Sequence, residues 1–347
     1  MSKQRNPVVD AARALGIALV VVGHNYLITR DQKDIHDWIY SFHMPLFMML
    51  SGVFFSPRTT PYQSIQHKAK SLLKPYITVS VISAAVAALP QPSAQKAITI
   101  FGKVMLGSII AAPGTIEWMP LWFLPHLFVV QVTATLLYTK IKNPIAITAI
   151  SLIGVTLGQH LFFDKGLPWG IDLTPVSCGY FLLGHLLFPQ AKKTLSRPLV
   201  CSILSVGVGG IWAIAFIFLA PQVDFHLRVY SGANAFVVAM IGCSFAMCLC
   251  GAIQQWPRLA QPVCALGQYS LYILLFHGWI QGKITGTLAS RFESTWIPAC
   301  AGAAGAIFVS VLLGKLIERT RIVRPLFLPG GSKQPITPPR HGSNRFS

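Results

Sequence analysis

Repeated apolar blocks of about twenty residues constrain this chain most, because a helix of that length crosses the hydrocarbon core of a bilayer. Of the 347 residues, 53% are hydrophobic and only 11% are charged, whereas soluble domains carry about 25% charged residues. The sequence therefore predicts an all-α, polytopic integral membrane protein. We expect about ten transmembrane helices, at residues 8–28, 38–55, 75–90, 121–138, 145–163, 174–189, 199–220, 233–252, 263–284 and 297–317.

The charged residues predict how these helices are oriented. The formal net charge of +18 would suit a nucleic-acid-binding protein, but the basic residues lie in short loops between apolar blocks, as the positive-inside rule describes. We therefore expect a lipid bilayer and no nucleic acid as partner. With ten spans and a cytoplasmic N-terminus, most basic residues fall inside and most acidic residues outside, so both termini are expected to be cytoplasmic.

Two segments do not fit the pattern of simple spans. The block at residues 98–112 is apolar but short, and Lys103 interrupts it. If it crossed the membrane, the basic C-terminal tail would face out, so we expect a re-entrant or interfacial segment. Residues 1–320 are predicted to form one membrane domain that starts with an uncleaved signal anchor. Residues 321–347 are predicted to be a basic, disordered cytoplasmic tail.

The first apolar helix carries three ionisable residues, Asp10, Arg13 and His24. At about 100° per residue they share one helical face, and Arg13 and His24 are about 16 Å apart along the axis. A charged side chain in a bilayer usually faces a protein interior or a wet cavity. The simplest structural interpretation is an Asp10–Arg13 pair that orients the helix end, together with a core histidine.

Under this topology, histidines from four helices lie at a similar depth in the outer third of the membrane, namely His24, His43, His126 and His277. Histidine can accept and return a proton near neutral pH. Packing alone could explain His126. Hydrogen bonds to backbone exposed near Pro45 or Gly278 could explain His43 and His277. A four-histidine metal site is conceivable, but without an H-x-x-x-H pair we expect no metal. The seven cysteines form no C-x-x-C pair, so no disulfide framework or zinc site is expected.

Arg13 lies in the inner third, where a fixed cation suits an anionic group that enters from the cytoplasm. The inner loop before the third span adds Lys68, Lys70 and Lys74, although positive-inside topology alone would explain any one of them. Glu117 is expected at the outer mouth, beside the fourth span.

The motif Asp10-x-x-Arg13, followed by ten residues and His24, resembles the first-helix motif of the family-3 membrane acyltransferases. The likeness is greatest to the fucose 4-O-acetylase-like branch, which decorates surface polysaccharides. Four further segments resemble the same family in the same order: S-F-H-M-P-L-F from Ser41, K-S-L-L-K-P-Y from Lys70, L-W-F-L-P-H-L-F from Leu121 and G-Q-Y-S-L-Y-I-L-L-F-H from Gly267.

The resemblance implies a sugar O-acetyltransferase in the bacterial cytoplasmic membrane. It would move an acetyl group from cytoplasmic acetyl-CoA, a donor substrate rather than a tightly bound cofactor, to a polysaccharide or glycolipid hydroxyl on the far side. By position, Arg13 would help to hold the donor and His24 would be the essential histidine. Relatives with an R-x-x-R pair before the third span differ from this chain, which has Lys68 and Ser71 there.

The remaining roles are hypotheses that follow from this reading. Asp10 would fix Arg13 in the catalytic unit, and His24 would act either as a general base or as an acylated nucleophile. Lys70 and Lys74 would contact the donor. The acceptor end would be formed by His43, Glu117, Trp122 and His277. A transporter or flippase for a polar solute, and a non-catalytic assembly factor for glycan export, remain the alternatives.

Overall fold

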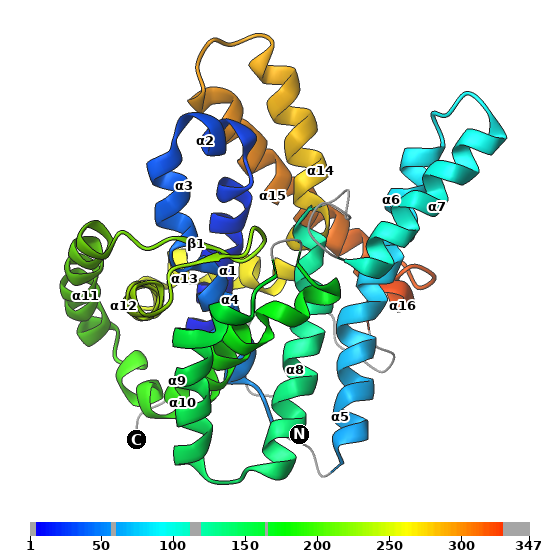
Figure 1. The fold of residues 1–347 in the computed structure, drawn as a ribbon. Coiled ribbons are helices and arrows are strands. Elements are labelled where there is room, and N and C mark those ends of the chain that lie inside the picture. The colour runs from blue at the N-terminus through cyan, green and yellow to red at the C-terminus, as the bar shows by residue number, and fades with distance from the viewer. Residues whose placement is uncertain (1–4, 57–59, 112–118, 164–165, 329–347) are drawn as a thin grey trace, which may run out of the picture.

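The computed structural model describes residues 5–56, 60–111, 119–163 and 166–328. These residues form a mostly helical molecule with one two-stranded antiparallel sheet (Figure 1). The first half contains α1 (Pro7–Gly23), α2 (Tyr26–Asp31), α3 (Lys33–Tyr40), α4 (His43–Val53), α5 (Pro61–Lys68), the π-helix η1 (Ala69–Leu73), α6 (Lys74–Ala88), α7 (Ala94–Ile110), η2 (Met119–Trp122) and α8 (Phe123–Lys140). The second half contains α9 (Pro144–Leu157), η3 (Gly158–Leu161), η4 (Pro168–Leu173), α10 (Thr174–Leu195), α11 (Pro198–Leu219), β1 (Val223–Asp224), β2 (Val229–Tyr230), α12 (Ala233–Ile253), α13 (Pro257–Gln268), α14 (Ser270–Ala289), α15 (Trp296–Arg319) and α16 (Arg324–Phe327).

The long helices agree with a multi-pass membrane protein. Within the described residues, seven helices are long and apolar enough to cross a membrane, or up to eight if the bent pair α13–α14 counts as one span. The expected number of ten is not confirmed, because the first two predicted spans are shorter or broken. α1 has 17 residues and α4 has 11.

Three of the predicted spans are interrupted, which corrects the continuous helices expected from the sequence. The span predicted at 8–28 ends at Gly23, and His24 caps it before α2 begins. The span predicted at 38–55 divides into α3 and α4 at Ser41 and Phe42. The span predicted at 263–284 divides at Tyr269, where α13 and α14 are bent by 76°. Hydropathy is averaged over a long window, so it does not reveal such breaks; α13 and α14, for example, pass as one apolar span despite the bend.

The region from α5 to α7 differs from the prediction in another way. The third predicted span, expected at residues 75–90, is part of a longer helical segment that runs from Pro61 to Ala88 through η1. α7 is a regular helix of 17 residues that packs alongside α6 (Figure 1). The residues that follow it, 112–118, lie outside the described residues, and a re-entrant path is not confirmed.

α1 lies at the centre of the bundle because other helices approach it closely. A Cβ atom on Gly267 of α13 would lie 1.9 Å from the Asp10 carbonyl oxygen, so only glycine permits this crossing. At the other end of α1, the Asn25 side chain donates to Thr285 Oγ1 and to the Ala299 carbonyl, each at 3.3 Å. These contacts fix α1 against α13, α14 and α15.

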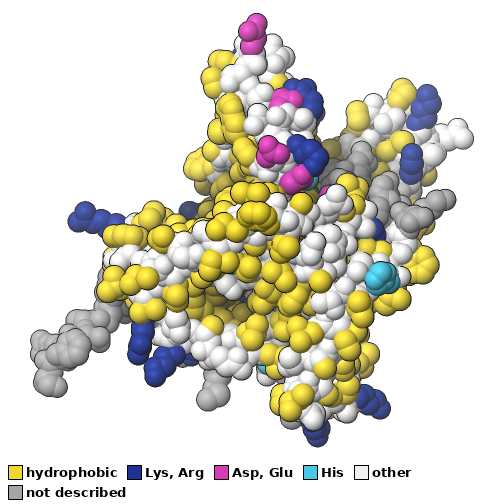
Figure 2. Space-filling view, turned by 60° about the vertical axis from the view of Figure 1, so that its left-hand side comes forward, with side chains coloured by type: hydrophobic (Ala, Val, Ile, Leu, Met, Phe, Trp, Pro, Cys, Tyr) yellow, Lys and Arg dark blue, Asp and Glu magenta, His cyan; other side chains and the backbone are white. Residues whose placement is uncertain are grey.

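The surface has the character expected of a membrane protein. Figure 2 shows hydrophobic side chains over the middle of the molecule and acidic side chains near the upper end of that view. The acidic residues of α2 and α3 are Asp31, Asp34 and Asp37. Part of the predicted disordered tail is instead helical: Phe327 of α16 is buried, and its ring centroid lies 6.1 Å from that of Phe276. Residues 329–347 lie outside the described residues.

Candidate active site

A cavity of about 250 Å³ runs along one face of α1 and contains several of the residues identified from the sequence. α1 contributes Arg13, Ile17, Val20 and His24 to its wall, at the spacing of three to four residues that one helical face provides. The predicted common face of Arg13 and His24 is therefore the face that lines the cavity. The apolar side chains between them are joined by others from α4 and α14, including Phe47, Leu271 and Leu274.

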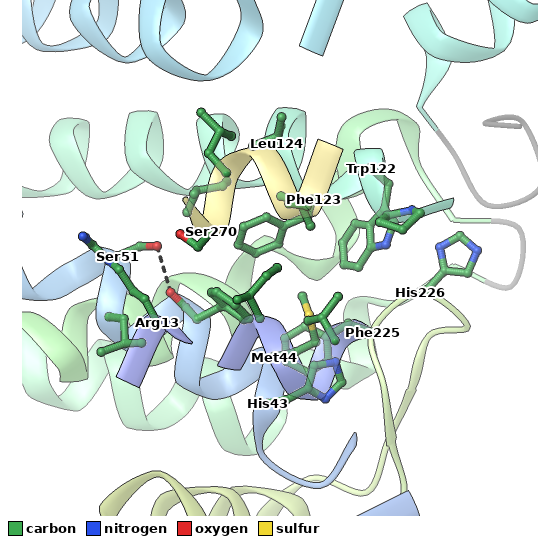
Figure 3. A pocket seen from close by; sticks show the side chains of 18 of the residues that line it. Arg13, His43, Met44, Ser51, Trp122, Phe123, Leu124, Phe225, His226 and Ser270 are labelled. Atoms are coloured by element: carbon green, nitrogen blue, oxygen red, sulfur yellow. Dashed lines mark hydrogen bonds between the residues drawn. The ribbon is translucent and has the colours of Figure 1, made fainter. Parts of the chain in front are cut away.

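Arg13 lies at one end of the cavity with its guanidinium group only loosely engaged (Figure 3). Its Nη1 atom is 3.6 Å from Asp10 Oδ1, and its Cζ atom is 5.4 Å from the ring centroid of Phe54. Among the described residues it has no hydrogen-bond acceptor. The side chain of Arg13 is 35% exposed, whereas that of Asp10 is 10% exposed. Arg13 can therefore donate hydrogen bonds to a ligand, whereas Asp10 lies behind it and does not line the cavity.

The basic segment before α6 also contributes to the Arg13 end of the cavity, but through other residues than predicted. Ser71 and Leu72 line the cavity, but Lys70 and Lys74 are not among its lining residues. The two lysines lie within one helical turn of Ser71; Lys70 is exposed and Lys74 is partly buried. The local π-helical geometry of η1 is a rare form that is frequent at functional sites.

His24 lies further along the cavity, at the break that ends α1. Its backbone has φ −90° and ψ 4°, in a sparsely populated region that many active-site residues adopt. Its ring is partly buried, and its centroid lies 5.8 Å from that of His277 and 6.3 Å from that of Tyr40. No hydrogen bond holds the ring within the described part of the chain, so both ring nitrogens are available to a substrate.

The two neighbouring histidines are held in one tautomer by backbone carbonyls. His43 Nδ1 lies 3.0 Å from the Ile39 carbonyl oxygen, and His277 Nδ1 lies 2.7 Å from that of Ile273. Because a carbonyl only accepts, Nδ1 carries the proton, and Nε2 of the neutral ring is an acceptor. His43 lines the cavity, whereas His277 is fully buried behind His24, and its Nε2 atom has no partner among the residues that the structure describes.

The opposite end of the cavity contains Trp122, as Figure 3 shows. Glu117, which was expected beside it, lies outside the described residues. His126 does not join the histidine group, which corrects the prediction of four converging histidines. Its Nε2 lies 2.8 Å from Ser177 Oγ and its Nδ1 lies 3.3 Å from the Trp169 carbonyl oxygen, so this buried side chain has a structural role.

Three ionisable residues of the cavity were missed by the sequence analysis: Tyr40, Asp224 and His226. The last two lie on the hairpin formed by β1 and β2, in a short connection between two long helices. His226 is adjacent to Trp122, with ring centroids 5.9 Å apart. Burial raises the pKa of Asp224, an effect that the Leu227 N–H opposes, and burial lowers the pKa of His226. The short D-F-H sequence carries two ionisable groups in a loop between two apolar helices, and this signal could have identified them.

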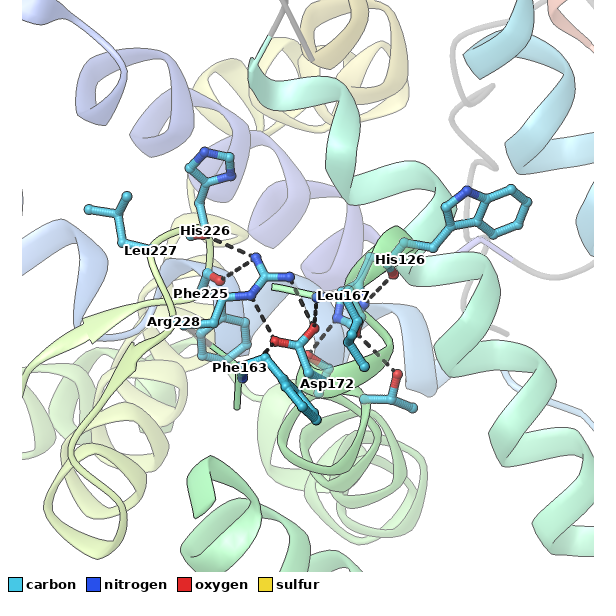
Figure 4. Close-up of polar contacts among 12 residues, drawn as sticks. His126, Phe163, Leu167, Asp172, Phe225, His226, Leu227 and Arg228 are labelled. Atoms are coloured by element: carbon cyan, nitrogen blue, oxygen red, sulfur yellow. Dashed lines mark hydrogen bonds and ion pairs between the residues drawn. The ribbon is translucent and has the colours of Figure 1, made fainter. Parts of the chain in front are cut away.

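The hairpin is fixed to the neighbouring loop by a buried ion pair (Figure 4). Arg228 Nε lies 2.9 Å from Asp172 Oδ2, and Arg228 Nη2 lies 3.1 Å from Asp172 Oδ1. The side chains are 5% and 0% exposed. Arg228 has a φ of +59°, a left-handed conformation that costs a non-glycine residue about 1–3 kcal/mol and persists only where its surroundings enforce it.

No group of three or more His, Cys, Asp or Glu side chains could hold a metal ion in the part of the chain that the structure describes. The seven cysteines, all within that part, are unpaired. The lining of the cavity provides one guanidinium group, one carboxyl group and three imidazoles, which suits proton transfer and the binding of an anionic ligand at one end.

Comparisons with known proteins identify the family. A family model described as an acyltransferase domain, the acyltransferase-3 model, matches residues 6–315. No curated protein and no solved structure matched the chain. The family match covers α1 and every other element that lines the cavity. The chain therefore belongs to the family-3 acyltransferases and is a membrane acyltransferase.

Proposed function

We propose that this protein is an O-acetyltransferase that moves an acetyl group from cytoplasmic acetyl-CoA to a sugar hydroxyl of an exported or surface polysaccharide or glycolipid. The observation that most directly supports this proposal is that Arg13 and His24 line one cavity, with apolar side chains between them. Such a cavity joins an anion-binding end to an acid–base end. Its proposed location is the bacterial cytoplasmic membrane, with both termini in the cytoplasm.

The donor would enter at the Arg13 end. Guanidinium groups bind phosphate oxygens through paired, charge-assisted hydrogen bonds, and the guanidinium of Arg13 is not saturated by acceptors within the described residues. Lys70 and Lys74 would add positive charge at the mouth beside Ser71, without reaching the cavity wall. The apolar section formed by Ile17 and Val20 suits the pantetheine arm, which would carry the thioester toward His24.

The transfer step would take place at His24. Acting as a general base, a ring nitrogen removes the proton from the acceptor hydroxyl while its oxygen attacks the thioester carbonyl. The C–S bond then breaks, and the CoA sulfur leaves with the proton that His24 returns. Acting as a nucleophile, the ring would first take the acetyl group from sulfur and then pass it to the hydroxyl. Both routes require an unprotonated ring nitrogen that faces the cavity.

The acceptor would approach from the opposite end. Trp122 offers an aromatic face to a sugar ring, and His43 offers an Nε2 acceptor to a hydroxyl. His277 would support His24 from behind, and Glu117 is proposed at the same end of the cavity. Asp10 would hold Arg13 in place through their ion pair.

Replacing His24 with alanine tests this proposal. Base catalysis contributes about 10²–10⁴-fold, so membranes with His24→Ala supplied with radiolabelled acetyl-CoA should give no detectable labelled glycan. His160→Ala is the matched control, because His160 is an exposed histidine of η3 outside the cavity lining, and its labelling should equal that of the wild type.

The amounts of inserted protein, measured with an epitope tag, must be equal in all samples. Labelling of glycan by His24→Ala at the wild-type rate would exclude His24 from the mechanism. Wild-type membranes that label no glycan, but move a polar solute, would indicate a transporter or flippase. Glycan acetylation that survives loss of both Arg13 and His24 would indicate an assembly factor.

A further inference from the structure

We propose that the loop of the β1–β2 hairpin is a carbohydrate-recognition element, in which Asp224 and His226 bind hydroxyls of a neutral acceptor sugar. In the same proposal, Arg228 and Asp172 form a positioning pair that holds this loop at the cavity. The inference rests on the proposed acetyltransferase function and specifies its substrate class.

The loop combines an anchored backbone with polar side chains that face the cavity. Phe225 is 1% exposed and packs in the core, while its neighbours Asp224 and His226 are partly buried and line the cavity. Asp224 Oδ1 accepts a hydrogen bond from the Leu227 N–H at 3.0 Å. This bond orients the carboxyl group at the start of the loop.

Arg228 connects this loop to a second loop that is distant in sequence. One side of its guanidinium group forms the two-bond contact with Asp172, and the other donates to the carbonyls of His226 at 3.0 Å and Phe225 at 3.4 Å. Asp172 also accepts from the Leu167 N–H at 3.0 Å. Figure 4 shows the guanidinium group between the hairpin and η4. The pair thus holds the backbone of Phe225, which lies between the two recognition groups, and of His226, which is one of them.

The combination of side chains at this end indicates the chemistry of the ligand. A carboxylate accepts hydrogen bonds from hydroxyls, an imidazole can donate or accept them, and an indole ring packs against the apolar face of a sugar. The Nδ1 atom of His226 is buried without a partner in the described structure. Asp224 is the one acidic residue among the described residues that line the cavity. Its negative charge would repel a uronic acid or a phosphorylated sugar, so the sugar bound here is neutral.

Competition experiments test this inference on the full-length protein in membranes. Glycan labelling from radiolabelled acetyl-CoA is measured at increasing concentrations of a competing glycoside. The neutral competitors are methyl glucoside, methyl galactoside and methyl fucoside, and the uronides are methyl glucuronide and methyl galacturonide. In the wild type the neutral glycosides should inhibit and the uronides should not. Asp224→Asn should weaken inhibition by the neutral glycosides about tenfold, the effect of one charge-assisted hydrogen bond. It should also allow the uronides to inhibit.

The positioning pair is tested by the double variant Asp172→Asn with Arg228→Gln, which leaves no unpaired buried charge. It should weaken inhibition by the neutral glycosides, and it should leave both the exclusion of uronides and the acetyl-CoA concentration for half-maximal labelling unchanged. The control is Arg30→Gln with Asp31→Asn, an arginine–aspartate pair on the exposed surface of α2, which should change none of these values.

The outcomes separate the two proposals. Wild-type membranes that transfer no acetyl group from acetyl-CoA contradict the proposed function itself. If transfer occurs but uronides inhibit as well as neutral glycosides, or no glycoside inhibits, the recognition element is overturned. An unchanged neutral–uronide preference in Asp224→Asn overturns it as well, even if the double variant fails to fold.

Discussion

Two arginine–aspartate pairs in this molecule have the same chemistry and opposite environments. Arg228 and Asp172 are almost completely buried and form two short hydrogen bonds, and Arg228 binds two further carbonyls. Arg13 and Asp10 are separated by 3.6 Å, and the arginine is about one-third exposed to the cavity. The first guanidinium group is saturated by the protein, whereas the second retains donors for a ligand.

The difference shows how the same residue types can serve structure or binding. A buried ion pair offsets its desolvation cost only when its geometry is good and its other hydrogen bonds are satisfied. The Arg228 pair meets both conditions, so it fixes two loops. An arginine that faces a cavity does not need full satisfaction by protein groups, because water or a ligand can supply acceptors. The number of protein acceptors around each arginine therefore separates the two roles.

The largest expected effect on stability is that of Arg228→Ala. This change leaves the Asp172 carboxylate buried without its partner, which costs about 3–5 kcal/mol. Denaturant unfolding of the purified protein in detergent should show a loss of this size. If Arg228→Ala unfolds at the same denaturant concentration as the wild type, the pair does not stabilise the fold, and the contrast between the two arginines fails.

The next effect is on activity and concerns Arg13. Arg13→Gln removes the charge at the donor end, so we expect about 100-fold less acetyl transfer at low acetyl-CoA, or about 2.7 kcal/mol. Arg13→Lys keeps the charge but loses the paired donors, and should lose about tenfold. Both variants should unfold like the wild type, because Arg13 forms only the loose 3.6 Å contact with Asp10 among the described residues. Equal losses for Lys and Gln would contradict paired binding of the donor.

The smallest expected effect is that of Asp10→Asn. A partly exposed pair at 3.6 Å contributes about 0–1 kcal/mol, so the acetyl-CoA concentration for half-maximal labelling should change by less than about fivefold. Stability should change within the same range. Loss of activity as severe as that of Arg13→Gln would show that Asp10 takes part in the reaction directly.

Helical periodicity allowed the central part of the site to be predicted from the sequence. The positions of Arg13, Ile17 and Val20 on one face depend only on the rotation per residue, and the structure places them with His24 on one cavity. A charged side chain in a bilayer is kept away from lipid, so this face was predicted to point to the protein interior or to a cavity, and it lines a cavity. The roles of these residues in catalysis stay predictions.

The rest could not be predicted, because it depends on contacts between distant segments. The pairing of Arg228 with Asp172 joins residues 56 positions apart, and neither loop shows a local pattern. His126 was predicted to join the other histidines from its position along the fourth span, but that position does not reveal which neighbour a side chain will bind, and Ser177 binds it. The break at His24 depends on Asn25, whose side-chain partners Thr285 and Ala299 lie on α14 and α15.

The apolar section between Arg13 and His24 has a consequence for the cell as well as for catalysis. Under the proposed function the cavity admits a substrate from each side of the membrane, and a passage of that kind also threatens to dissipate the electrochemical gradient. Side chains such as Ile17, Val20 and Leu274 offer no replacement for the hydration shell of a proton or metal cation, and hydrophobic constrictions exclude ions on this ground. The same apolar lining that is proposed to guide a thioester would therefore keep ions on one side from reaching the other.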